Sequence, residues 1–166
     1  MRFSGFYIFL LLTLLTGCSS GSKKASGADI GFQLTKADTT GDVKAIITKV
    51  GTLVTVNKLE DATNYITINL HRFKGLDKAA LLNERGSAYF LKDDFDHAIA
   101  DYLAAYDFDT TNATVIMNTA RTYECMENLN NAKFFAVKIA NTTTATDSDR
   151  VQAKELIVRC DRNHTR

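Results

Sequence analysis

The sequence predicts an all-α protein built from a row of similar helical hairpins, and three observations support this. The 166 residues contain no proline, the residue that costs about 3 kcal/mol inside a helix. From residue 42 onward, apolar residues recur at the three- and four-residue spacings of a helix that buries one face. The pattern of small and large residues also repeats, as it does in stacked units that share a core.

The composition is that of a globular protein. Hydrophobic residues make up 45% of the chain and charged residues 23%, and the formal net charge is +1. A disordered chain contains fewer apolar residues and more charge, and a nucleic-acid-binding protein is usually strongly basic. We therefore expect a folded protein that does not bind nucleic acid.

Residues 1–17 have the three-part pattern of an export signal. Arg2 precedes an apolar run over residues 6–15, and small residues follow. This run is shorter than the roughly 20 residues that span a bilayer. The motif Leu15-Thr16-Gly17-Cys18 resembles the lipobox of bacterial lipoproteins. The resemblance implies that residues 1–17 are removed and that Cys18 becomes an N-terminus bearing fatty acids such as palmitate. The alternative is an ordinary signal peptide with an incidental cysteine.

The resemblance to lipoproteins also implies a location. In Gram-negative lipoproteins, an aspartate after the cysteine usually retains the protein in the inner membrane, and this chain has Ser19 there. We therefore expect a lipid anchor in the outer membrane that faces the periplasm. Residues 18–41 are expected to be a flexible tether, because residues 19–28 are small and polar.

The first predicted hairpin begins after Asp42. Ile46, Val50 and Leu53 lie on one helical stripe. β-Branched residues are frequent here and would also suit a strand, but the strict alternation of a half-buried strand is absent, so we predict a helix. A second stripe follows at Leu59, Ala62 and Ile66.

The next two hairpins, residues 79–112 and 113–146, share a pattern of small and large residues. The second hairpin has Gly86, Tyr89, Ala98, Tyr102 and Ala105, and the third has Ala120, Tyr123, Ala132, Ala136 and Ile139. The pattern resembles the tetratricopeptide repeat (TPR), a helix–turn–helix unit of 34 residues. The match to the TPR pattern is best in residues 79–112. In the third hairpin, Ala136 and Ile139 depart from the TPR pattern. Small residues such as Gly86 are expected to let the two helices of a hairpin approach closely.

The TPR resemblance implies an α-solenoid of three hairpins over residues 42–144 and a capping helix over residues 145–166. Side chains suited to N-caps occur at Asp42, Asp77, Asp94 and Asn112. Thr146 and Asp149 have the spacing of a capping box before the last helix.

Sequence motifs of catalysis and of metal binding are not found. There is no HExxH, no Cys-x-x-Cys, no phosphate-binding glycine loop and no serine nucleophile motif. Asp93, Asp94, Asp96 and His97 crowd one turn, but the spacing of a calcium loop is missing, so we interpret them as a polar turn with an N-cap. We therefore expect a protein that is not an enzyme and that has no catalytic residues, metal or cofactor.

Two cysteines follow Cys18. Cys125 and Cys160 occupy similar places in neighbouring units, and an exported protein can form disulfides. Two interpretations stay open, a disulfide between them or two separate buried thiols.

The TPR resemblance also implies where a partner binds. In that family, the first helix of each hairpin lines a concave groove. The positions carried over to this chain are Ile47, Val54, Asn83, Ser87, Phe90, Leu91, Met117, Arg121 and Glu124. Phe90, Leu91 and Met117 are the candidate apolar anchors. The alternative for Phe90 and Leu91 is that residues 29–41 cover them.

These observations predict a membrane-anchored periplasmic adaptor that binds another envelope protein through a TPR groove. The chain is similar to pilotin-like lipoproteins of pilus and secretin assembly, which suggests a scaffold role in such a machine. The alternative is recruitment of a peptidoglycan- or protein-remodelling enzyme. Self-association through the first hairpin is a further hypothesis.

Overall fold

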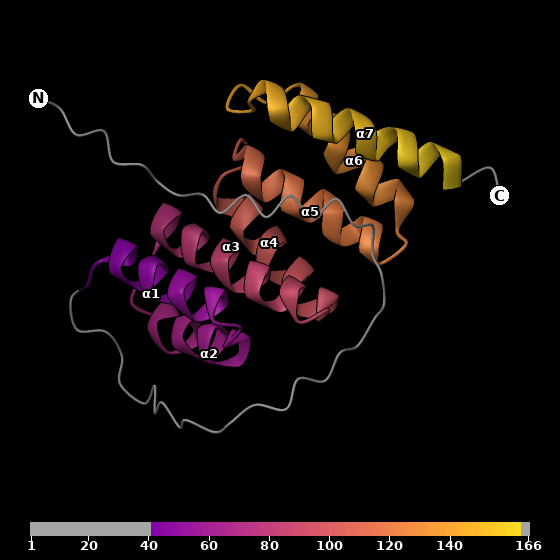
Figure 1. The fold of residues 1–166 in the computed structure, drawn as a ribbon. Coiled ribbons are helices and arrows are strands. Elements are labelled where there is room, and N and C mark those ends of the chain that lie inside the picture. The colour runs from indigo at the N-terminus through magenta and orange to yellow at the C-terminus, as the bar shows by residue number, and fades with distance from the viewer. Residues whose placement is uncertain (1–40, 164–166) are drawn as a thin grey trace, which may run out of the picture. The chain divides into compact units, whose positions relative to one another are not determined.

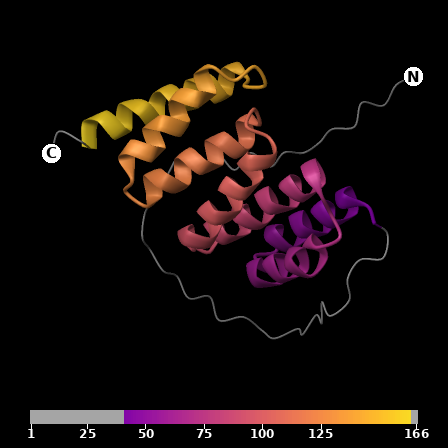
Figure 2. The same ribbon diagram turned by 180° about the vertical axis from the view of Figure 1, so that it is seen from behind.

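The computed structural model describes residues 41–163, and the secondary structure in this range is helical. The helices are α1 (Val43–Thr55), α2 (Leu59–Leu70), α3 (Gly75–Leu91), α4 (Phe95–Phe108), α5 (Ala113–Cys125), α6 (Leu129–Ala140) and α7 (Asp147–Asn163). The described helices stack in chain order, from the α1–α2 hairpin at one end to α7 at the other (Figures 1 and 2). The predicted all-α stack of three hairpins and a terminal helix is confirmed. The export signal, Cys18 and most of the tether lie outside the described residues.

Among residues 41–163, no helix combines the length and the apolar character needed to cross a bilayer.

The first hairpin shows why its β-branched sequence forms a helix. Ile46 and Val50 are fully buried, and they pack with Ala62 and Ile66 of α2 and Leu81 of α3. This contact requires a stripe along one helical face, whereas a strand would send alternate residues to opposite sides. The helix prediction is confirmed.

The turn inside each hairpin has the same backbone geometry. Its middle residue, which is Asn57, Asp93 or Glu127, has a φ of 58° in all three hairpins, a conformation uncommon outside glycine. The next residue donates its N–H to the carbonyl five residues earlier, in the bonds Lys58–Leu53, Asp94–Tyr89 and Asn128–Tyr123, at 2.8, 3.0 and 2.9 Å. Closures of this kind end a helix. The repeat in the sequence is therefore also a repeat in the backbone.

Most of the predicted caps are present. Asp42, Asp94 and Asn112 each accept a backbone N–H at the start of a helix. Thr146 and Asp149 bond reciprocally, with Thr146 N to Asp149 Oδ2 at 2.8 Å and Asp149 N to Thr146 Oγ1 at 3.2 Å.

The Asp77 prediction is wrong, because α3 begins two residues earlier at Gly75. Gly75 adopts a φ of 54°, which glycine accepts without steric cost. Asp77 therefore lies in the first turn, where a negative charge interacts favourably with the helix dipole.

An ion pair joins α3 to α4, and a hydrogen bond from the same arginine reaches α2. Asp101 is only 6% exposed and accepts two hydrogen bonds of 2.7 Å from the Arg85 guanidinium. The same guanidinium donates to the Thr67 hydroxyl at 3.0 Å. The hydrogen bonds to Asp101 raise the pKa of Arg85. The sequence analysis missed this pair because its members lie on different helices.

The helices α3 and α4 approach very closely at Gly86. A Cβ added there would lie 2.9 Å from Cε1 of Tyr102. The Tyr102 side chain is only 2% exposed, and its hydroxyl donates to Ser87 Oγ at 3.1 Å. The ring therefore has little room to move away from an added methyl group, and the predicted role of Gly86 in close packing is confirmed.

We predict that Gly86→Ala lowers the free energy of unfolding by up to about 2 kcal/mol. Overpacking costs about 1–3 kcal/mol, which exceeds the gain of up to about 1 kcal/mol from replacing a helical glycine by alanine. Urea denaturation followed by circular dichroism measures the change. The matched control is Gly51→Ala in α1, because Gly51 is exposed and an added Cβ meets no atom within 4 Å. That variant should gain about 0.5–1 kcal/mol, and equal stabilisation of both variants would contradict the steric explanation.

Candidate functional site

The candidate site lies on the side of the stack where α3, α5 and α7 are in front of α4 and α6 (Figure 1). We call it the odd-helix face. It comprises the predicted groove positions on α1, α3 and α5 other than Met117, together with three further side chains, Glu84, Asn118 and Gln152. The odd-numbered helices line it because each even-numbered helix packs behind its hairpin partner.

A chain of hydrogen bonds crosses the odd-helix face between α3 and α5. The Asn118 amide donates to Asn83 Oδ1 at 3.0 Å. Ser87 Oγ donates to the Asn83 carbonyl at 2.9 Å and accepts from the Tyr102 hydroxyl at 3.1 Å. Burial raises the pKa of Tyr102, so this phenol remains a donor. Asn83 and Ser87, both predicted groove residues, are therefore brought together and held in fixed orientations.

A second polar group joins α5 to α7. Glu124 accepts two hydrogen bonds from Arg159, at 2.7 and 3.0 Å. Its charge is therefore already compensated within the chain. Arg121 donates to the side-chain oxygen of Gln152. Desolvation lowers the pKa of Arg121, and the positive charge of Arg159 lowers it further.

Glu84 differs from the other acids on this face. Its side chain is half-buried, and its hydrogen-bond partner is the Asn83 amide at the long distance of 3.4 Å. Among the described residues, no basic group lies within ion-pair distance of Glu84. Burial raises the pKa of Glu84. The sequence analysis missed this residue, although it lies directly after the predicted groove position Asn83.

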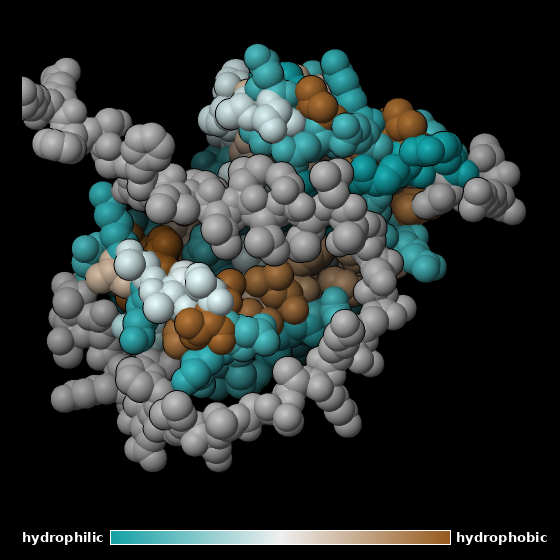
Figure 3. Space-filling model, in the orientation of Figure 1, coloured by the Kyte–Doolittle hydropathy of each residue, from teal (hydrophilic) through white to brown (hydrophobic). Residues whose placement is uncertain are grey.

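Apolar side chains make up the α1–α3 part of the face. Leu91 is 41% exposed. Phe90 is half-buried, with its ring 5.4 Å from that of Phe95. Ile47 and Val54 are also half-buried and pack against the core beneath them. Figure 3 shows hydrophobic surface over α1 and α3 and mostly hydrophilic surface over α7.

The prediction that Met117 is a surface anchor is wrong. Met117 is only 4% exposed and belongs to a core cluster with Ile116 of α5 and Leu156 of α7. The terminal helix packs against α5 and covers this side chain. The Met117 side chain therefore stabilises the stack and does not reach the surface.

Of the two interpretations of Cys125 and Cys160, the disulfide between them is excluded, because Cys160 is a free cysteine. Cys160 is a free thiol, 2% exposed, in the same core cluster as Met117. Burial raises the pKa of this thiol. The preceding residue, Arg159, makes the contact with α5 through Glu124, whereas Cys160 lies one position further around the helix and is buried in the core.

The acidic turn before α4 is a cap. The Asp94 carboxylate accepts the His97 N–H at 3.3 Å and lies 2.8 Å from His97 Nδ1. The interpretation as a polar turn with an N-cap is confirmed. Within residues 41–163, no three His, Cys, Asp or Glu side chains are grouped as metal ligands.

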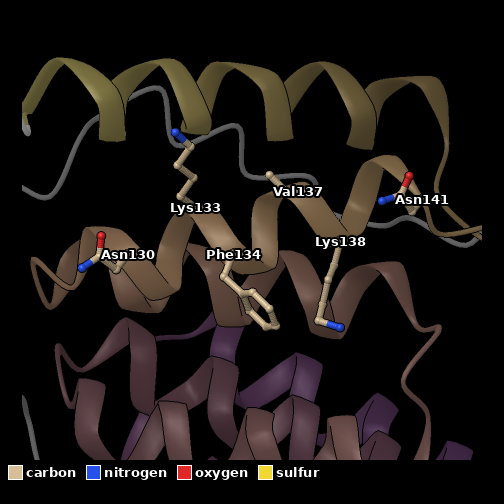
Figure 4. Close-up of a pocket in the computed structure, with 6 residues that line it drawn as sticks. All are labelled: Asn130, Lys133, Phe134, Val137, Lys138 and Asn141. Carbon is tan, nitrogen blue, oxygen red and sulfur yellow. The ribbon is translucent and has the colours of Figure 1, made fainter.

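A separate surface lies on the outer side of α6 (Figure 4). Phe134 is 55% exposed there, and the Lys138 ammonium is 4.9 Å from the centre of its ring. These two residues and Asn130, Lys133, Val137 and Asn141 line a shallow pocket. The pocket is outside the predicted groove, and its residues provide control positions for tests of the odd-helix face.

Comparisons with known proteins agree with the fold. The NMR structure of the first TPR domain of the human RPAP3 protein is similar to this chain with a TM-score of 0.64 and 14% identity, over 73% of this chain and 93% of that one. The first TPR of Spaghetti (RPAP3) bound to the HSP90 peptide SRMEEVD has a TM-score of 0.57 and 17% identity, over 72% and 93%. No protein-family model and no curated protein sequence matches this chain. The fold is therefore TPR-like.

We predict that Glu84→Gln raises the free energy of unfolding at pH 7. A raised pKa means that the folded state binds the proton more tightly than the unfolded state, so the contribution of Glu84 to stability is greatest below its ordinary pKa of 4.5 and decreases as the pH rises. The advantage of glutamine should therefore be largest at neutral pH and small near pH 4. Urea denaturation at both pH values measures it. The control is Glu155→Gln at an exposed position of α7, which should change stability little at either pH.

Proposed function

We propose that this chain is a non-enzymatic adaptor of the bacterial cell envelope. A lipid on Cys18 anchors it in the outer membrane, and the helical stack faces the periplasm. The odd-helix face binds a segment of another envelope protein. The lipid holds the protein at the membrane surface, and the helical stack binds the partner protein.

One observation carries the binding part of this proposal. The odd-helix face combines exposed apolar surface at Leu91 with fixed polar groups at Asn83, Ser87 and Asn118. Apolar anchors beside oriented hydrogen-bonding groups are typical of surfaces that bind a peptide or a helix. A similar TPR domain was solved with a peptide bound, which is consistent with this use of the fold.

The motif at Leu15–Cys18 supports the lipid anchor. The resemblance to pilotin-like lipoproteins suggests the assembly in which the protein takes part. We propose a role in pilus or secretion-system assembly, in which the lipid brings a bound partner to the membrane. Because folds of this kind serve many processes, the identity of the partner decides this point.

We predict that a photo-crosslinking amino acid at position 91 captures an envelope protein in living cells. Leu91 is exposed on the proposed face, so the probe should lie against the bound segment. The matched control is the same amino acid at position 134, which is also exposed but lies on the outer side of α6. Mass spectrometry identifies the adduct. Equal adducts at both positions, or none at position 91, would contradict the proposed face, and capture of a peptidoglycan hydrolase would favour the recruitment alternative.

We predict that Cys18→Ser abolishes incorporation of labelled palmitate and releases the protein into the soluble periplasmic fraction. Attached acyl chains contribute about 0.8 kcal/mol per buried CH₂ group, and this variant has no attachment site for them. Labelling in cells and separation of the membranes on a sucrose gradient measure both effects. Cys160→Ser serves as the cysteine control and should keep the label. Unchanged labelling of Cys18→Ser would exclude the lipid anchor.

A further inference from the structure

We propose that the segment bound on the odd-helix face places a lysine or arginine side chain against Glu84. This inference rests on the proposed function and adds the chemistry of the partner. It assigns to Glu84 the role of a specificity-determining residue, which neither the TPR resemblance nor the comparisons suggest.

Glu84 contrasts with the two acids that form ion pairs between helices. Asp101 accepts two hydrogen bonds of 2.7 Å from Arg85, and Glu124 accepts bonds of 2.7 and 3.0 Å from Arg159. Glu84 is half-buried, and its hydrogen-bond partner is a neutral amide at 3.4 Å. The folded chain therefore holds a partly desolvated carboxylate without a compensating cation among its described residues.

The described arginines near this face already have other partners, and Arg121 donates to the side-chain oxygen of Gln152. Arg85, the residue after Glu84, has its guanidinium on Asp101 and Thr67, on the side of α3 that faces α2 and α4. Arg159 pairs with Glu124. The cation that the proposal requires at Glu84 is therefore assigned to the bound segment. A carboxylate withdrawn from water gains more from a charge-assisted hydrogen bond than an exposed one does.

Glu84 and the exposed apolar side chain of Leu91 lie at a fixed spacing on α3. Glu84 and Leu91 are seven residues apart on α3, which is about 10 Å along a helix. An extended segment advances about 3.3 Å per residue. A segment lying along α3 would therefore carry an apolar side chain about three residues from its basic one.

The experiment selects peptides on the full-length chain in detergent, immobilised through a C-terminal tag, from a displayed library of random dodecapeptides. The wild type should enrich peptides with a lysine or arginine about three residues from an apolar residue. Glu84→Gln should lose this basic preference, and Glu84→Lys should favour aspartate or glutamate instead. Glu155→Gln is the matched control and should select the same peptides as the wild type.

The affinity of a selected peptide provides the quantitative test. A hydrogen bond to a charged group contributes about 1.5–3 kcal/mol, so Glu84→Gln should weaken binding about tenfold or more. The same variant is expected to be more stable than the wild type, so weaker binding cannot be attributed to unfolding. If Glu84→Lys does not fold, as judged by circular dichroism, Glu84→Gln alone decides.

The outcomes separate this inference from the proposed function. Peptides that bind the face, compete with one another and lose affinity on Leu91→Glu, but show no basic preference or bind Glu84→Gln equally well, would overturn the role of Glu84 and leave the adaptor proposal standing. Failure to select any peptide that is sensitive to Leu91→Glu would count against the binding face itself, and the role of Glu84 would be withdrawn with it.

Discussion

The close approach of α3 and α4 at Gly86 determines how the odd-helix face is held together. The ring of Tyr102 fits against α3 because residue 86 has no Cβ. Its hydroxyl then reaches Ser87, and Ser87 in turn donates to the Asn83 carbonyl. The Asn83 side chain accepts from Asn118 of the next hairpin. A steric contact inside one hairpin is thus connected to a polar contact between hairpins, and the orientations of the surface groups depend on the packing of the core.

Charge is distributed on this scaffold in two ways. In the ion pairs Arg85–Asp101 and Glu124–Arg159, the charges of the two side chains compensate each other. Each pair joins two neighbouring helices. Glu84 has no such cation among the described residues. A buried charge without a compensating partner is costly, so a half-buried acid that has no cation among the described residues calls for an explanation. Recognition of a partner's cation provides one, because the cost in the free chain is then recovered on binding.

The two sides of the stack differ in what they offer a partner. The odd-helix face has oriented amide and hydroxyl groups between α3 and α5 next to apolar surface on α3. The outer side of α6 has an exposed phenylalanine, Phe134, with the Lys138 ammonium 4.9 Å from the centre of its ring. Similarity to TPR domains shows the fold of this chain. Because one fold serves many functions, the proposed binding depends on the side chains of this chain.

Local sequence patterns were enough to predict the helical hairpins, most of their caps and the contact at Gly86. Each depends on residues close together in the chain: apolar residues three or four apart, a side chain that bonds the first turn, and a small residue at a fixed place in the unit. Other outcomes came from the packing of the helices: α7 covers Met117, Cys160 is a free buried thiol, and among residues 41–163 no cation pairs with Glu84 as Arg85 does with Asp101 and Arg159 does with Glu124. These outcomes depend on which sides of distant helices meet, and helical periodicity limits but does not specify how one hairpin lies against the next.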